Sequence, residues 1–300
     1  MYLYSVIIPH YNIPNLLNHA INSIPERNDI QIIVADNSYK SIIGDYSRSL
    51  NNHIEIIHTQ HLLGAGHARN KALDCALGRW ILFLDADDSF CEGAFDEFDK
   101  YSNTDLDIII FKSESFYLGS QEKSCRCNAI NKLIDNFQKN KPHSEDALKF
   151  SYHPVWGKMF NSTTIKNNNI RFDEVIAGND AMFSIKASGY ARKIAVSSFV
   201  AFSITDRKWS LTNNANIMNE RSRFCVRINI YHYLTSIDRK AYRPLMLNEI
   251  FKGLRFNVSE FLWRIKTIRK EKINVFYKIP RNIGHILFDF ILEKRRHNME

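Results

Sequence analysis

Several features are missing from this 300-residue sequence, and each absence narrows the class of protein. It has 5 cysteines, an odd number without the spacing of a disulfide framework or zinc knuckle, so we expect reduced thiols. No apolar run approaches the ~18 residues of a membrane-spanning helix. The start, MYLYSVIIPHYN, lacks the basic region and cleavage site of a signal peptide and predicts a first strand instead. We therefore expect a cytoplasmic location.

An excess of positive charge is also missing from most of the chain. The first 251 residues hold 28 Lys and Arg against 27 Asp and Glu, whereas residues 252–300 hold 12 against 5. In that basic part, Lys and Arg alternate with aromatic residues and Ile, as in helices that lie at a membrane interface. One expectation is peripheral binding to an anionic membrane surface, on the inner face of the cytoplasmic membrane. The other is that the aromatics pack on the protein itself or in a homodimer. No nucleic-acid module is present, so we expect no nucleic-acid partner.

The first third of the sequence alternates between apolar strands and helical segments. Helices are predicted around residues 14–24 and 67–78, and strands in YSVIIPHY, IQIIVADNS, HIEIIHTQ and WILFLDADD. Near-continuous apolar strands in this alternation indicate an α/β fold, with a mostly parallel, Rossmann-like sheet flanked by helices. The pattern becomes helical after residue 213. We therefore expect two domains, 1–212 and 213–300.

Polar residues follow three of the predicted strands, in PHYN, ADNS and DADD. Ligands of such sheets bind beyond the carboxyl ends of the strands, so these segments are expected to form one site. If the fourth strand continues through Asp85 and Asp87, both side chains face one way, with Asp88 at the turn. Clustered carboxylates repel one another, and oxygen ligands suit Mg²⁺ or Mn²⁺ bound to a diphosphate. A solvated acidic turn, with Asp88 capping the next helix, is the alternative.

Two other ligand patterns are weak. The histidines near this edge, His10, His58, His61 and His67, straddle strand and loop, so we do not expect a histidine metal site. The segment LLGAGHARN suggests a nicotinamide dehydrogenase. That interpretation is disfavoured because Arg69 replaces the third glycine of G-x-G-x-x-G and the motif follows the third strand.

In order and spacing, the segments SVIIPHYN, IIVADNS, GAGHARNKAL and GRWILFLDADD resemble family 2 glycosyltransferases, which have the GT-A fold. The resemblance continues through VWGKMFNSTTIKNNNIRFDEVIAGNDAMF and covers residues 4–212. It implies an inverting enzyme that moves a hexose or N-acetylhexosamine from a UDP-sugar to a saccharide acceptor, with a lipid-linked acceptor favoured. The product would be a cell-surface polysaccharide such as O-antigen, capsule or lipooligosaccharide. The alternative is a catalytically inactive protein of this fold that binds a nucleotide sugar.

The resemblance also implies roles for individual residues. Asp180 would be the general base that takes the proton from the acceptor hydroxyl. Asp87 and Asp88 would hold Mn²⁺ or Mg²⁺, which neutralises the leaving UDP. Tyr11 would stack on the base, and Asp36 would accept a hydrogen bond from uracil N3–H. The full nucleotide-binding set would be Pro9, Tyr11, Asp36, Arg69, Asp85 and Arg207, with Arg69 at a helix N-terminus. Trp156, Lys158 and Asn179 are expected near the acceptor.

Two positions depart from the usual pattern of the family. Asn179 stands directly before Asp180, where the family usually has Glu, so we expect an acceptor contact to change. The segment DNSYK, which begins at Asp36, lacks the usual third carboxylate of its motif. The proposed base and the proposed uracil contact are both retained.

Overall fold

The computed structural model describes residues 1–39, 53–60, 63–207 and 216–276 of the chain. The chain divides into two compact units, Met1–Ser222 and Arg223–Glu300. The domain boundary predicted between residues 212 and 213 lies outside the described residues, so it stays a prediction.

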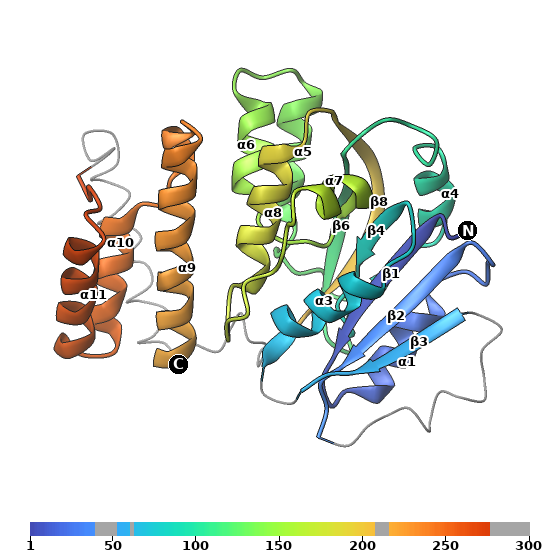
Figure 1. The fold of residues 1–300 in the computed structure, drawn as a ribbon, viewed down its shortest axis with the longest axis horizontal. Helices are drawn as coiled ribbons and strands as arrows, with labels where there is room; N and C mark the ends of the chain where they lie inside the picture. The colour runs from blue at the N-terminus through green and yellow to red at the C-terminus, as the bar shows by residue number, and fades with distance from the viewer. Residues whose placement is uncertain (40–52, 61–62, 208–215, 277–300) are drawn as a thin grey trace. The chain divides into compact units, whose positions relative to one another are not determined.

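Within the described residues, the first unit is built on an eight-stranded sheet with the order β3-β2-β1-β4-β7-β6-β8-β5 (Figure 1). The strands are β1 (Tyr4–His10), β2 (Ile30–Asp36), β3 (His53–His58), β4 (Trp80–Phe83), β5 (Ser89–Phe90), β6 (Ile108–Tyr117), β7 (Lys158–Asn161) and β8 (Ile194–Asp206). The first four in the sheet order are parallel, whereas β7 runs antiparallel to both of its neighbours. The prediction of a mostly parallel α/β sheet is confirmed.

Helices cover the sheet on both faces, and Figure 1 shows α3 in front of the strands and α1 behind them. The helices of this unit are α1 (Pro14–Asn22), α3 (Gly64–Cys75), α4 (Ala94–Asp99), α5 (Asn128–Gln138), α6 (Ser144–Ser151), α7 (Ser162–Asn167) and α8 (Asn179–Tyr190). Cover on two faces explains why the inner strands are apolar at nearly every position. In β1, for example, Val6, Ile7 and Ile8 are all completely buried.

The second unit is helical in its described part, as the sequence predicts. It contains the C-terminal part of α9 (Ile217–Ser236), then η1 (Lys240–Tyr242), α10 (Met246–Phe251), η2 (Lys252–Arg255) and α11 (Val258–Lys270). Its core includes Phe224, Ile250 and Ile268, and Arg264 is completely buried with its Nε 3.0 Å from Glu260 Oε1. Over the part of the chain that the structure describes, no helix has the length and apolarity needed to cross a bilayer.

Candidate active site

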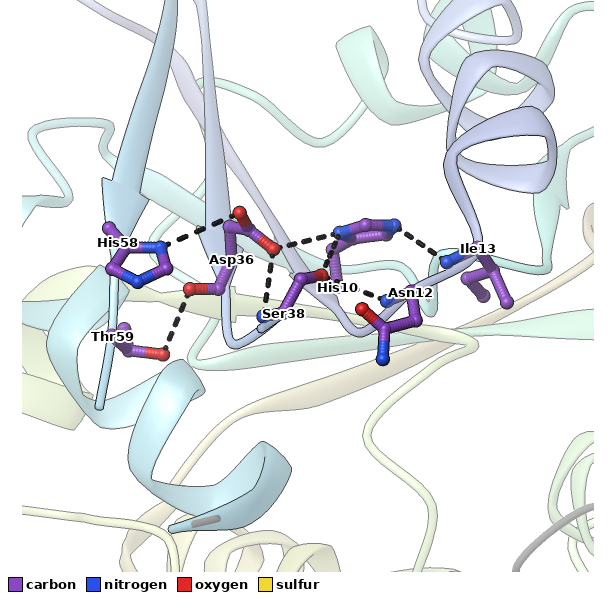
Figure 2. Close-up of polar contacts among 7 residues, drawn as sticks. All are labelled: His10, Asn12, Ile13, Asp36, Ser38, His58 and Thr59. Carbon is purple, nitrogen blue, oxygen red and sulfur yellow. Dashed lines mark hydrogen bonds and ion pairs between the residues drawn. The ribbon is translucent and has the colours of Figure 1, made fainter. Parts of the chain in front are cut away.

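The carboxyl ends of β1, β2 and β3 bring three titratable side chains together. In the parallel register, His10 lies opposite Asp36, and Asp36 lies opposite His58. Figure 2 shows the Asp36 carboxylate between the two imidazole rings. His10 Nδ1 lies 3.0 Å from Asp36 Oδ1, and His58 Nδ1 lies 3.6 Å from Asp36 Oδ2. Asp36, the predicted uracil contact, is thus completely buried and anchored on the β1 side.

The other two predicted base contacts lie at the same edge. Tyr11 follows β1, has 47% of its surface exposed, and its ring centroid lies 6.3 Å from that of Tyr39. Pro9 is the half-buried penultimate residue of β1. An aromatic stacking face and a polar contact are the two features that a planar base requires, and Tyr11 and Asp36 lie at the same sheet edge. The specific roles of Pro9, Tyr11 and Asp36 stay predictions.

The three aspartates after β4 come together through a turn, and the strand-based explanation for their proximity is wrong. β4 ends at Phe83, and Asp88 N donates to Asp85 O at 2.9 Å, which closes a tight turn. We call residues 85–88 the acidic turn. One carboxylate oxygen from each of Asp85, Asp87 and Asp88 lies within 4.8 Å of the other two. The turn therefore brings the side chains of Asp85 and Asp87 together, which strand alternation was expected to do, and it adds Asp88 to the group.

Each carboxylate of the acidic turn has a partner from a distant part of the chain. Arg69 Nη2 donates to Asp85 Oδ1 at 2.5 Å, and Arg207 Nε lies 2.8 Å from Asp87 Oδ2. Asp88 Oδ1 accepts from Thr205 N at 2.8 Å. Thr205 lies near the end of β8 and Arg207 directly follows it, so the end of this strand contributes two partners of the acidic turn.

The electrostatics of the acidic turn fit a divalent cation. Burial raises the pKa of Asp87, and the neighbouring Asp85 charge raises it further, although Arg207 opposes both effects. Burial also raises the pKa of Asp88 well above its usual value, with added repulsion from Asp87 and Asp85. Asp87 and Asp88, two crowded carboxylates that resist ionisation, are the kind of ligand that Mg²⁺ or Mn²⁺ would stabilise in the charged form.

Asp180, the predicted base, lies in the first turn of α8 and is partly exposed. Gly178, with φ of +82°, precedes this helix in the left-handed region that favours glycine. α3 packs closely against the start of α8 and the loop before it, because a Cβ on Gly66 would lie 3.0 Å from Asn179 Cβ and 2.2 Å from Asp173 O. Burial raises the pKa of Asp180, while the positive charge of Arg69 lowers it. Such a carboxylate has the environment of a general base.

Arg69 links the acidic turn to the residue beside Asp180. Its Nη1 donates to Asn179 Oδ1 at 2.8 Å, while its other terminal nitrogen bonds Asp85. The expected place of Arg69 at a helix N-terminus is wrong, because α3 begins at Gly64 and Arg69 lies in its second turn. Its Nε is buried and has no hydrogen-bond partner among the residues that the structure describes. Asn179 can accept from Arg69 but, unlike Glu, cannot neutralise it.

The residues expected near the acceptor are buried. Lys158 is completely buried, and its Nζ donates to Tyr152 O at 2.7 Å and lies 3.3 Å from Ser184 Oγ. Burial lowers the pKa of Lys158 to about 7, and the Asp180 charge acts in the opposite direction. Trp156 is only 5% exposed and its carbonyl accepts from Tyr152 Oη. Neither side chain offers a surface in this conformation, and their acceptor roles stay predictions.

Sequence reasoning missed the pairing of His10 and His58 with Asp36. Both histidines were considered only as metal ligands. The signal that could have found them is the strand register: in parallel strands with aligned ends, terminal polar residues become neighbours. The hydrogen bond from Thr205 N to Asp88 in the acidic turn has no local sequence signal, because the two residues are 117 positions apart.

Fold and site together define a class: an α/β protein with a nucleotide-compatible sheet edge, an acidic turn suited to a cation, and a partly buried carboxylate beside it. Residues 5–145 match the model of glycosyl transferase family 2. This match covers 141 of the 300 residues, so that part of the chain is a family 2 glycosyltransferase domain, and the chain has the GT-A fold. Both parts of the resemblance read from the sequence motifs are confirmed.

Two of the curated relatives are bacterial glucosyltransferases. Poly(ribitol-phosphate) beta-glucosyltransferase of Bacillus spizizenii is 28% identical over 205 residues, 64% of this chain and 30% of that protein. The GalNAc(5)-diNAcBac-PP-undecaprenol beta-1,3-glucosyltransferase of Campylobacter jejuni is 25% identical over 183 residues, 59% of this chain and 57% of that protein. The crystal structure of S. aureus TarS 1–349 with UDP-GlcNAc has a TM-score of 0.67 at 19% identity, covering 90% of this chain and 80% of that one, which shows a shared fold. The chain thus spans from about a third to just over half of these curated relatives.

Proposed function

We propose that this chain is an inverting, metal-dependent glycosyltransferase that moves a hexose or N-acetylhexosamine from a UDP-sugar to a saccharide acceptor. The observation that carries the proposal is the connection through Arg69. This one side chain bonds both Asp85 in the acidic turn and Asn179, the neighbour of Asp180. This connection supports the proposal because a displacement at the anomeric carbon requires a diphosphate-binding group and a base close to each other.

The reaction assigned to these residues is a single displacement. Asp180 takes the proton of the acceptor hydroxyl while that oxygen bonds to the anomeric carbon, and the bond from that carbon to UDP breaks with its electron pair. Bound at Asp87 and Asp88, Mn²⁺ or Mg²⁺ would supply positive charge for the departing diphosphate. Attack from the side opposite UDP inverts the anomeric centre. The names of both curated relatives, each a beta-glucosyltransferase, agree with that stereochemistry for an α-linked donor.

The nucleotide is assigned to the edge formed by β1, β2 and the acidic turn. Tyr11 and Pro9 would lie against the base, and Asp36 would accept from the uracil N3–H. Arg207 and Asp85 lie next to the proposed metal ligands, where the diphosphate and the ribose or sugar would be. A structural neighbour of the same fold was crystallised with UDP-GlcNAc, which supports UDP as the nucleotide.

The acceptor is proposed to be a cell-surface glycan, either lipid-linked or based on a polyol phosphate. One relative is named for an undecaprenol-linked saccharide and another for poly(ribitol phosphate). A membrane location for the second unit would suit a lipid-linked acceptor. On α11, Val258 and Leu262 are 64% and 56% exposed, and Lys266 continues the same helical face. Such a face, apolar at one end and basic at the other, matches an anionic lipid surface.

The first test is a screen of UDP-sugars with a lipid-pyrophosphate saccharide acceptor, read by mass spectrometry, with Asp180→Asn as the matched variant. We expect transfer by the wild-type protein and a loss of about 10²- to 10⁴-fold in the variant. Stabilisation by UDP and Mn²⁺ in thermal unfolding should be equal in both proteins. If the variant loses UDP binding and transfer to the same extent, Asp180 is not the base. If the wild-type protein binds UDP but shows neither transfer nor slow donor hydrolysis, it is an inactive nucleotide-sugar-binding protein.

A further inference from the structure

His10 is a buried side chain at the carboxyl edge of the sheet. It is the last residue of β1, and its side chain is completely buried. Both ring nitrogens have partners (Figure 2): Nδ1 lies 3.0 Å from Asp36 Oδ1 and 3.3 Å from Ser38 Oγ, and Nε2 lies 3.0 Å from Ile13 N. The ring therefore connects the proposed base-binding carboxylate to the residue that precedes α1.

The contacts with Asp36 and Ile13 assign the ring proton. The backbone N–H of Ile13 can only donate, so Nε2 of His10 must accept and cannot carry a hydrogen. A neutral imidazole then has its proton on Nδ1, where it points to Asp36. The geometry thus selects the Nδ1–H tautomer, and the His10 ring is a donor toward Asp36.

The Asp36 carboxylate is oriented by this donor and by its own turn. Oδ1 accepts from His10 Nδ1–H and also from the backbone N–H of Ser38 at 3.1 Å. The backbone of Asp36 is held as well, because Thr59 N donates to its carbonyl at 2.8 Å. With Oδ1 directed at β1, Oδ2 lies on the side of His58, whose side chain is 44% exposed. Oδ2 is itself buried in this conformation, since the Asp36 side chain is 0% exposed, and the partly exposed His58 ring lies beside it.

Two N–H donors on one oxygen have a chemical consequence. They interact more strongly with a carboxylate than with a carboxylic acid, so they favour the form of Asp36 that only accepts hydrogen bonds. Uracil presents an N–H at ring position 3, whereas cytosine presents a lone pair there. A carboxylate that is fixed as an acceptor pairs with the first base and repels the second.

We propose that His10 is a positioning residue for base selection: it holds Asp36 as an acceptor-only carboxylate, and the site thereby binds uracil nucleotides in preference to cytosine nucleotides. This inference rests on the proposed function, since it assumes that Asp36 meets the base. It adds a residue that does not itself touch the nucleotide. A role for His10 in stability alone would predict no change in the choice between two bases of nearly equal size.

The test compares UDP and CDP binding by calorimetry with Mn²⁺ present, for the wild-type protein and three variants. In His10→Val the donor to Asp36 is lost, whereas His10→Asn keeps a side-chain N–H near the position of Nδ1. The control is His67→Val, because His67 makes a contact of the same 3.0 Å length to Glu174, away from Asp36. The tautomer is read separately from the ¹⁵N shifts of the imidazole in the wild-type protein, which requires no variant.

We expect the wild-type protein and His67→Val to prefer UDP to CDP by at least about tenfold. In His10→Val, UDP binding should weaken by about tenfold, the effect of one lost hydrogen bond to a charged group, while CDP binding changes little. His10→Asn should recover most of the preference, and the wild-type ring should show Nδ1–H. An unchanged UDP to CDP ratio in His10→Val, or a proton on Nε2, would overturn the role of His10 while leaving the proposed function intact. Failure of the wild-type protein to bind UDP would instead overturn the proposed function, and the role of His10 with it.

Discussion

The contact between Arg207 and Asp87 makes a prediction that separates two roles of one arginine. Arg207 Nε lies 2.8 Å from Asp87 Oδ2, the oxygen of the proposed principal metal ligand. A cation that binds Asp87 must therefore replace this ion pair. When UDP is also bound, however, the planar guanidinium of Arg207 is well suited to its phosphates. Replacing Arg207 by Gln should consequently strengthen binding of the cation alone and weaken binding of UDP with the cation.

The size of the first effect follows from burial. The Arg207 side chain is 32% exposed and that of Asp87 is 13% exposed, so solvent screens the pair in part. Ion pairs of this kind contribute about 1 kcal/mol, far below the Coulomb energy of two isolated charges at that distance. Removing the pair should thus tighten Mn²⁺ binding about fivefold in the absence of nucleotide. The second effect, loss of a contact to phosphate, should weaken UDP binding about tenfold.

Electron paramagnetic resonance of free Mn²⁺ measures the first affinity, and calorimetry with UDP at saturating Mn²⁺ measures the second. The matched control is Arg171→Gln, because Arg171 forms an exposed ion pair with Asp74 at 2.7 Å and should change neither affinity. The opposite signs are the decisive result. If Mn²⁺ binding is unchanged or weaker in Arg207→Gln, the ion pair does not compete with the cation. If UDP binding is unchanged, Arg207 does not contact the diphosphate.

Two further changes test the base and the second unit. Asn179→Glu adds a negative charge beside Asp180 and partly neutralises Arg69, and both effects raise the pKa of Asp180. The acid limb of the pH–rate profile for transfer should therefore move to higher pH. A limb that stays in place would show that Asp180 does not control it. Leu262→Asp places a charge on the exposed face of α11 and should reduce sedimentation with phosphatidylglycerol vesicles several-fold while leaving UDP binding unchanged. The control is Tyr190→Asp, an exposed position of the first unit, and equal vesicle binding by all three proteins would exclude this face.

The sequence predicted the inner strands and the acidic cluster because both depend on local patterns. Residues 80–83 form an apolar run, and such a run predicts a buried strand wherever it occurs in an α/β chain. The grouping of Asp85, Asp87 and Asp88 was also correct, yet the reason given for it was wrong. Strand alternation places every second side chain on one face, but the chain leaves the sheet at Leu84 and closes a turn that gathers all three.

The contacts between distant residues were beyond sequence reasoning because they depend on packing. That Asn179 bonds Arg69 follows from the close approach of α3 and α8, which requires the absence of a side chain at Gly66. Lys158 shows the same limit: its type and sequence position do not reveal that its Nζ is enclosed and donates to Tyr152 O, while its acceptor role stays a prediction. Burial of the Lys158 ammonium requires a nearby acceptor such as the Tyr152 carbonyl, and no local sequence pattern predicts where that carbonyl lies.

The arginines of the site bear on why a cation is needed at all. Arg207 and Arg126 both lower the pKa of Asp87, yet that pKa is still raised, so the two positive charges do not compensate for burial and for the charge of Asp85. The same holds for Asp88, which Arg126 and the Thr205 N–H also stabilise. A nucleotide diphosphate would bring additional negative charge to a turn that already resists ionisation. Binding of the diphosphate and binding of a divalent cation are therefore expected to be strongly coupled, because each reduces the electrostatic cost of placing the other beside the acidic turn.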